Sequence, residues 1–76
     1  MSDISDTLGN ETKLTALTNK VNRSRRKSGS SEITVDVIRT EYTLAKEIED
    51  AKVAGNLELV SSKMKELIAY QTQYGL

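Results

Sequence analysis

Apolar residues recur at helical spacing in three segments of the chain. In the first segment, Leu14, Leu17 and Val21 lie three or four residues apart, which places them on one side of a helix over about residues 10 to 22. Asn10 or Thr7 has a suitable side chain to cap the N-terminus of this helix. Because the apolar stripe is narrow and is interrupted by threonines and asparagines, the pattern predicts a helix that is weak in isolation.

The second segment begins with EITVDVIRT, in which β-branched residues alternate with polar ones as they do in a strand. Farther along, the apolar positions follow helical spacing instead. No other run of the chain alternates in the same way, so a strand here would have no partner. The pattern therefore favours a helix over about residues 35 to 54, with extended backbone only at residues 33 to 35. The apolar face of this helix consists of Val37, Ile38, Tyr42, Leu44, Ala45, Ile48 and Ala51.

A compact turn follows in the sequence Ala54-Gly55-Asn56. Gly55 suits the left-handed position after a helix end, and Asn56 suits the N-cap of the next helix. A helix over residues 57 to 74 is predicted next, with Gly75 as its stop. Two helices joined by so short a turn should fold back on each other as a hairpin. The apolar stripe of the last helix consists of Leu57, Val60, Met64, Leu67 and Ile68.

These segments predict an all-α fold, in which a C-terminal antiparallel helical hairpin follows a short, weaker N-terminal helix and a basic Ser/Gly connector. The small, polar run Ser28 to Ser31 is the clearest break in the chain. We therefore expect a polar N-terminal segment over residues 1 to 31, with a basic linker at residues 23 to 31. The hairpin is expected over residues 32 to 76.

The predicted hairpin offers each apolar stripe only one partner helix, so part of the apolar surface should stay uncovered. Tyr70 and Tyr74 lie one helical turn apart beside this surface. They suit either an anchor for a binding partner or ordinary packing at the edge of a core. The predicted partner-binding residues are Ile38, Tyr42, Leu67, Tyr70 and Tyr74.

Composition narrows the possible functions. A chain of 76 residues has a small core, and without cysteine or histidine it has neither disulfides nor the usual zinc ligands to reinforce that core. A protein partner, or a second copy, is the remaining means of stabilisation. The chain also has no histidine base, no cysteine nucleophile and no glycine-rich phosphate loop. We therefore expect a protein that is not an enzyme and that uses no cofactor and no metal.

The net charge is zero, but its distribution is uneven. Residues 13 to 27 contain six bases and no acid, whereas residues 1 to 12 contain three acids and no base. The basic run suits a nucleic-acid contact that reads no sequence, a phosphorylation site at Ser28, or cations at a helix end that begin a soluble connector. It also suits docking on an acidic surface. The predicted charged docking residues are Lys20, Arg23, Arg25, Arg26 and Lys27.

The start of the chain lacks the basic and apolar regions of a signal peptide, and no apolar run is long enough for a membrane span. We therefore expect a cytoplasmic protein, or one within an assembly built from cytoplasmic subunits. The favoured function is a non-enzymatic protein–protein interaction module, a small subunit or adaptor of a larger assembly such as a viral, phage or secretion assembly. Its partner would be another protein or a second copy of itself. The alternative is a small nucleic-acid-binding or transcription-regulating protein that uses Arg23 to Lys27.

Overall fold

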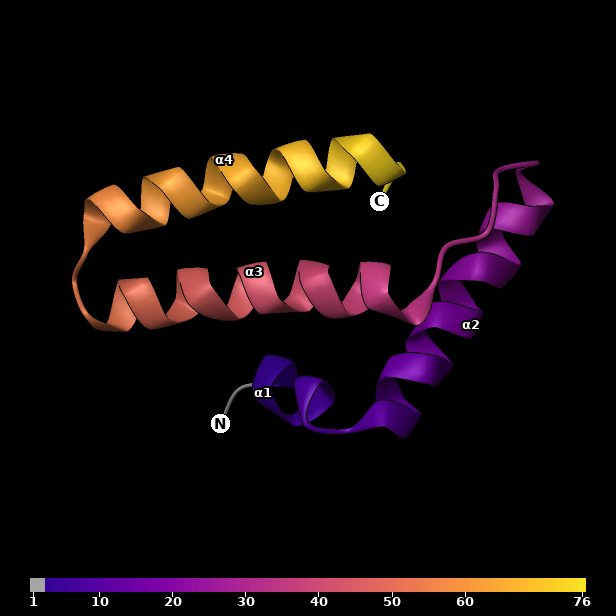
Figure 1. Ribbon diagram of the computed structural model, residues 1–76, viewed down its shortest axis with the longest axis horizontal. Coiled ribbons are helices and arrows are strands. Elements are labelled where there is room, and N and C mark those ends of the chain that lie inside the picture. Colours follow the sequence, from indigo (N-terminus) through magenta and orange to yellow (C-terminus); the bar gives the residue numbers. More distant parts are fainter. Residues whose placement is uncertain (1–2) are drawn as a thin grey trace. The chain divides into compact units, whose positions relative to one another are not determined.

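The computed structural model describes residues 3–76, and these residues form four α-helices and no strand (Figure 1). The helices are α1 (Asp3–Leu8), α2 (Glu11–Lys27), α3 (Val35–Val53) and α4 (Leu57–Tyr74). Helices α3 and α4 run antiparallel and pack against each other, with the chain reversing in the short turn between them (Figure 1). The predicted all-α fold with a C-terminal helical hairpin is confirmed.

Local chemistry explains where the helices begin. The side-chain oxygen of Asn10 accepts a hydrogen bond of 3.1 Å from the backbone N–H of Lys13, and Asn56 accepts one of the same length from Leu59. Both asparagines are therefore N-caps, which satisfy backbone donors that have no partner within their helix. The predicted N-caps of α2 and α4 are confirmed.

Three helices end in the same glycine-based motif. At the end of α2, Gly29 has a φ of 76°, and the N–H of Ser30 donates to the carbonyl of Arg25 at 2.8 Å. At the end of α3, Gly55 has a φ of 73°, and the N–H of Asn56 donates to the carbonyl of Ala51 at 3.0 Å. At the end of α4, Gly75 has a φ of 67°, and the N–H of Leu76 donates to the carbonyl of Gln71 at 2.8 Å. This pattern is a Schellman motif, which favours glycine because other residues are strained at positive φ. The predicted left-handed position of Gly55 is confirmed.

The chain divides into two compact units, one ending at Arg39 and the other covering Thr40–Leu76. The first unit contains α1, α2, the connector and the first turn of α3. Its buried residues include one fully buried side chain, Leu14, and two polar side chains, Thr18 and Asn22. Ile33 and Ile38 are also buried.

A single asparagine ties the connector of the first unit to α2. The side-chain amide of Asn22 donates to the carbonyl oxygen of Ile33 at 2.9 Å, and its side-chain oxygen accepts from the N–H of Ile33 at 2.8 Å. Both groups are buried, so these bonds satisfy a backbone donor and acceptor that water does not reach. This side chain therefore helps to fix the return of the chain toward α3.

The second unit is the hairpin. Ile48 and Ala51 of α3 and Val60 of α4 form its buried core, and the half-buried Leu67 packs against them. Polar pairs tie the same two helices together. Lys63 of α4 forms an ion pair of 2.9 Å with Glu47 of α3.

The side-chain amide of Gln71 also links the two helices, because it donates to the carboxylate of Glu41 at 3.0 Å. Lys63 has a second ion pair, 3.4 Å long, with Glu66 of its own helix. The hydrogen bonds to Glu47 and Glu66 raise the pKa of Lys63 above its ordinary value of 10.5. The hairpin therefore combines a narrow apolar core with polar links at its edge.

The N-terminal part of the chain contains more helix than the sequence predicted. Helix α1 was not predicted, and its six residues form a helix that contacts α2. Helix α2 ends at Lys27 and not near residue 22, so the expected basic linker at residues 23 to 31 is wrong in its first half. Arginine and lysine are good helix formers and interact favourably with a helix C-terminus, which explains the extension.

Among the residues that the structure describes, no helix is both long enough and apolar enough to cross a membrane.

Candidate partner-binding surface

Helix α4 has two apolar sides that the sequence pattern had merged into one stripe. Val60 and Leu67 face α3 and contribute to the core of the hairpin. Leu57, Met64 and Ile68 lie roughly 50–90° farther around the helix. Only the first set is covered by α3, so the second set forms a separate surface.

This second set is well exposed. Leu57 is 77% exposed, Ile68 is 59% exposed and Met64 is 45% exposed. With Ser61 between them, the three side chains follow positions 57, 61, 64 and 68, which are spaced by four, three and four residues. That is the spacing of the seam of a coiled coil. We call Leu57, Ser61, Met64 and Ile68 the α4 seam.

The α4 seam borders a groove between α3 and α4. Ala45, Ile48 and Lys52 line the groove from α3, and Met64, Leu67, Ile68 and Gln71 line it from α4. The groove lies wholly within the second unit and its lining is mainly apolar. Exposed apolar side chains beside an apolar groove are the surface features by which a protein binds another protein.

Two charged residues flank the α4 seam. Glu58 and Lys65 lie seven residues apart on the same side of the seam, and both are exposed. Neither forms an ion pair with any residue that the structure describes. Charges beside a coiled-coil seam select the partner and its orientation, and these two are available for that role.

The structure places the predicted apolar site residues in three different environments. Ile38 is 2% exposed and is buried within the first unit, so its assignment to an exposed partner-binding face is wrong. Leu67 is half-buried against the hairpin core and also lines the groove. Tyr42 is half-buried on α3.

Tyr70 and Tyr74 lie against each other on α4. Their ring centroids are 4.8 Å apart and the rings are tilted by 49°. Both side chains are half-buried, and their hydroxyl-bearing rings follow the same side of α4 as Leu67. This arrangement agrees with packing at the edge of the hairpin core. Around the circumference of α4 the pair lies on the other side of Leu67 from the α4 seam, so it does not belong to the exposed surface.

The predicted charged residues all lie on α2, and two of them have partners. The Nε–H of Arg25 donates to the carbonyl oxygen of Ser31 at 2.6 Å, and Arg26 forms an ion pair of 3.8 Å with Glu32. Both contacts fold the connector back toward the end of α2. The remaining predicted residues, Lys20, Arg23 and Lys27, are exposed.

Three apolar residues of the candidate surface were assigned by the sequence pattern to the packing stripe of the last helix. Leu57, Met64 and Ile68 fit that stripe, but the hairpin contact uses only its other edge. The informative signal was their spacing, because positions 57, 61, 64 and 68 form a heptad series that excludes Val60 and Leu67. Val53, at the end of α3, is 86% exposed and was not predicted as a surface residue.

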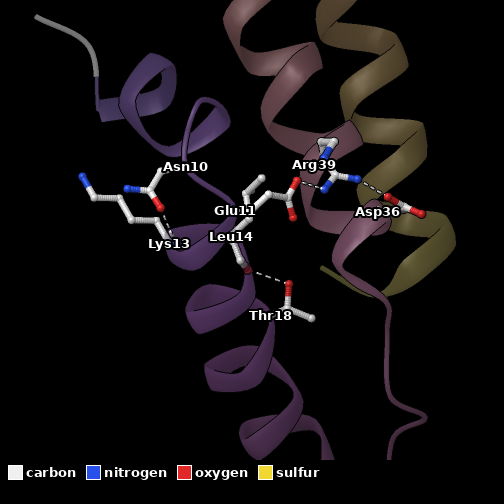
Figure 2. A network of polar contacts seen from close by, with 7 residues as sticks. All are labelled: Asn10, Glu11, Lys13, Leu14, Thr18, Asp36 and Arg39. Carbon is white, nitrogen blue, oxygen red and sulfur yellow. Dashed lines mark hydrogen bonds and ion pairs between the residues drawn. The ribbon is translucent and has the colours of Figure 1, made fainter.

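Helix α2 and its neighbours form a second polar network in the first unit. Arg39 of α3 pairs with Glu11 at the start of α2 and with Asp36 one turn before it, as Figure 2 shows. The hydroxyl of Thr18 donates to the carbonyl of Leu14 at 2.8 Å (Figure 2). These contacts stabilise α2 and direct its first acidic residue toward α3.

Comparisons with protein-family models, curated proteins and solved structures found no match for this chain.

Proposed function

We propose that this protein is a non-enzymatic interaction module that assembles through the α4 seam and the adjoining groove. The observation that carries the proposal is the exposure of Leu57, Met64 and Ile68 at coiled-coil spacing beside an apolar groove. In a hairpin with so small a core, covering these side chains would bury apolar surface that the single chain leaves in water. The module would serve as a small subunit or adaptor of a larger assembly.

The occupant of this surface that the residues favour is a second copy of the chain. The α4 seam has the order large, small, large, large, and its spacing reads the same in both directions. In an antiparallel pair of α4 helices related by a two-fold axis, Leu57 lies opposite Ile68 of the second copy. Ser61 then lies opposite Met64, so a small side chain meets a long, flexible one. Two hairpins joined in this way form a four-helix bundle.

The flanking charges favour the same antiparallel orientation. In this register Glu58 of each copy comes close to Lys65 of the other, which gives two symmetric ion pairs. A parallel pairing would instead place Lys65 beside Val60 of the second copy, and the position that would face Glu58 precedes the start of α4, so neither ion pair would form. Charge complementarity therefore distinguishes a second copy in this orientation from an arbitrary apolar partner.

Substitution of one seam residue tests the proposal. Ile68→Asp places a charge in the proposed interface, and we expect it to weaken self-association about tenfold or more. The matched control is Leu59→Asp, because Leu59 is an exposed leucine on another side of α4, outside the seam. Sedimentation equilibrium measures both variants, and circular dichroism checks that both keep their helices. Equal weakening by the two variants would contradict the proposed surface.

The flanking charges supply a second part of the same test. Glu58→Lys and Lys65→Glu should each weaken self-association, and the double variant should restore it because the ion pairs re-form with reversed polarity. If the double variant does not regain the self-association of the unaltered chain, the antiparallel register is refuted. If the unaltered chain is a monomer at every concentration, the second copy is not the occupant.

A cytoplasmic location stays a prediction from the sequence.

A further inference from the structure

The outward side of α2 carries a row of cations that the proposed assembly does not use. Lys13, Lys20, Arg23 and Lys27 lie within about 80° of the helix circumference and extend over roughly 21 Å of its length. All four are exposed. None of them forms an ion pair with a residue that the structure describes. We call Lys13, Lys20, Arg23 and Lys27 the α2 cation row.

The row exists because the basic run is helical. In a flexible linker, Arg23 and Lys27 would have no fixed relation to Lys13 and Lys20. In α2, a separation of seven residues returns each side chain to nearly the same side of the helix, and Arg23 fills the interval between Lys20 and Lys27. The Schellman motif at Gly29 ends the helix just beyond the last cation.

No acid interrupts the row. The one acidic residue of α2 is Glu11, which lies on another side of the helix and pairs with Arg39 (Figure 2). The side chain of Lys13 points away from that pair in the same view. The two other cations of the basic run are directed to the connector, because Arg25 bonds Ser31 and Arg26 pairs with Glu32. The row is therefore an unneutralised line of positive charge.

We propose that the α2 cation row binds the phosphate backbone of a nucleic-acid duplex without reading its sequence. Such contacts are made by lysine and arginine together with small polar side chains. The row has both, because the exposed Asn19 and Ser24 flank it. Lys13 and Lys20 also line a shallow, open hollow together with Thr7, Ala16 and Leu17.

Two features favour a duplex over other anionic partners. In the described part of the first unit, no large apolar side chain is exposed, so α2 lacks the apolar anchors on which protein interfaces and membrane contacts depend. All three tyrosines of the chain, its only aromatic residues, belong to the second unit. The row therefore has no aromatic side chain on which the bases of a single strand would stack.

Salt-dependent binding of the full-length chain tests the assignment. The probes are a mixed-sequence DNA duplex of about 20 base pairs, the matching single strand and poly-glutamate, each labelled for fluorescence anisotropy. Four phosphate contacts predict a slope of about −3.6 for the logarithm of the duplex association constant against the logarithm of salt concentration. The double variant Lys20→Gln plus Arg23→Gln should reduce the magnitude of that slope by roughly 2.

The matched control lowers the net charge by two elsewhere in the chain. Ser62→Glu plus Gln73→Glu has the same net charge as the test variant, and both residues are exposed in the second unit, outside the α4 seam and its groove. We expect this control to bind the duplex as the unaltered chain does. An equal loss of duplex affinity in the test variant and in the control variant would overturn the assignment to α2. If poly-glutamate binds as tightly as the duplex, the partner is an acidic protein and the proposal is refuted. Tighter binding of the single strand than of the duplex would also refute it.

Discussion

Asn22 is the buried polar residue of the first unit whose side chain holds the connector against α2. Its side chain makes two hydrogen bonds with the backbone of Ile33, at 2.8 and 2.9 Å, and all of these groups are buried. An asparagine amide has one donor side and one acceptor side, which is the arrangement that a single residue's N–H and C=O require. The chemical identity of this side chain, and not only its polarity, therefore holds the connector in place.

Substitution of Asn22 gives a prediction with two arms. Asn22→Ala leaves the N–H and carbonyl of Ile33 buried without partners, and we expect a loss of about 2–4 kcal/mol in the free energy of unfolding. Asn22→Asp keeps the acceptor but places a carboxylate against the Ile33 carbonyl, which favours the protonated acid in the folded state. The stability of Asn22→Asp relative to the unaltered chain should therefore rise as pH falls through the raised pKa.

Urea denaturation at several pH values measures both arms. The difference between Asn22→Asp and the unaltered chain isolates the new carboxyl from the other acids, which titrate in both proteins. A difference that does not change between neutral and acidic pH would contradict the bonding described for Asn22.

At the scale of the element, Lys63 links the two helices of the hairpin. It pairs with Glu47 of α3 and Glu66 of α4, and these bonds raise its pKa above 10.5. A base whose folded-state pKa is raised contributes stability at pH values below its unfolded-state pKa, and that contribution disappears as pH rises through the folded-state pKa. The hairpin should therefore lose this contribution only in strongly alkaline solution.

A pair of glutamine variants tests the role of Lys63. Lys63→Gln should have a lower melting temperature than the unaltered chain at neutral pH, and the gap should narrow as pH rises above about 10.5. Lys20→Gln is the control, because Lys20 is exposed, has no ion pair with a described residue and lies outside the hairpin, so its melting temperature should follow the unaltered chain. Circular dichroism measures both melting curves. A constant gap for Lys63→Gln across this pH range would show that its bonds contribute nothing.

The elements also show which features a sequence can predict. The ends of the hairpin turn were predictable because Gly55 and Asn56 act through bonds to residues three to five positions away. The bonds of Asn22 to Ile33 were not, because they join residues separated by a helix end and a connector. The length of α2 was underestimated because a run of arginine and lysine suits both a linker and a helix.

The candidate site was only partly predictable for a related reason. Periodicity identified α4 as amphipathic, but its apolar residues span two adjacent edges, and the rotation of α4 against α3 decides which edge is covered. That rotation depends on packing between the helices. Leu67, which was predicted as a partner-binding residue, packs against the hairpin core, while Met64 and Ile68 were not recognised as exposed. Ile38 was misplaced because its side chain is buried, and the periodicity of a helix does not show which other segments cover its apolar residues.

At the scale of the whole molecule, charge and exposed apolar surface are separated along the chain. The α2 cation row lies in the first unit, and the large exposed apolar side chains of the described residues all lie between residues 53 and 76. The net charge of zero conceals this separation. The two proposals therefore concern different units of the chain, because self-association is assigned to the hairpin and the nucleic-acid contact to α2.

The most direct test of the central proposal is the mass of the unaltered, full-length chain in solution as its concentration rises. We predict that sedimentation equilibrium over about 1 µM to 1 mM gives an average mass that rises from the monomer value of 8.4 kDa to twice that value. The monomer should dominate at the lowest concentrations because the α4 seam is short. A mass that stays at 8.4 kDa over the whole range would contradict self-association through α4.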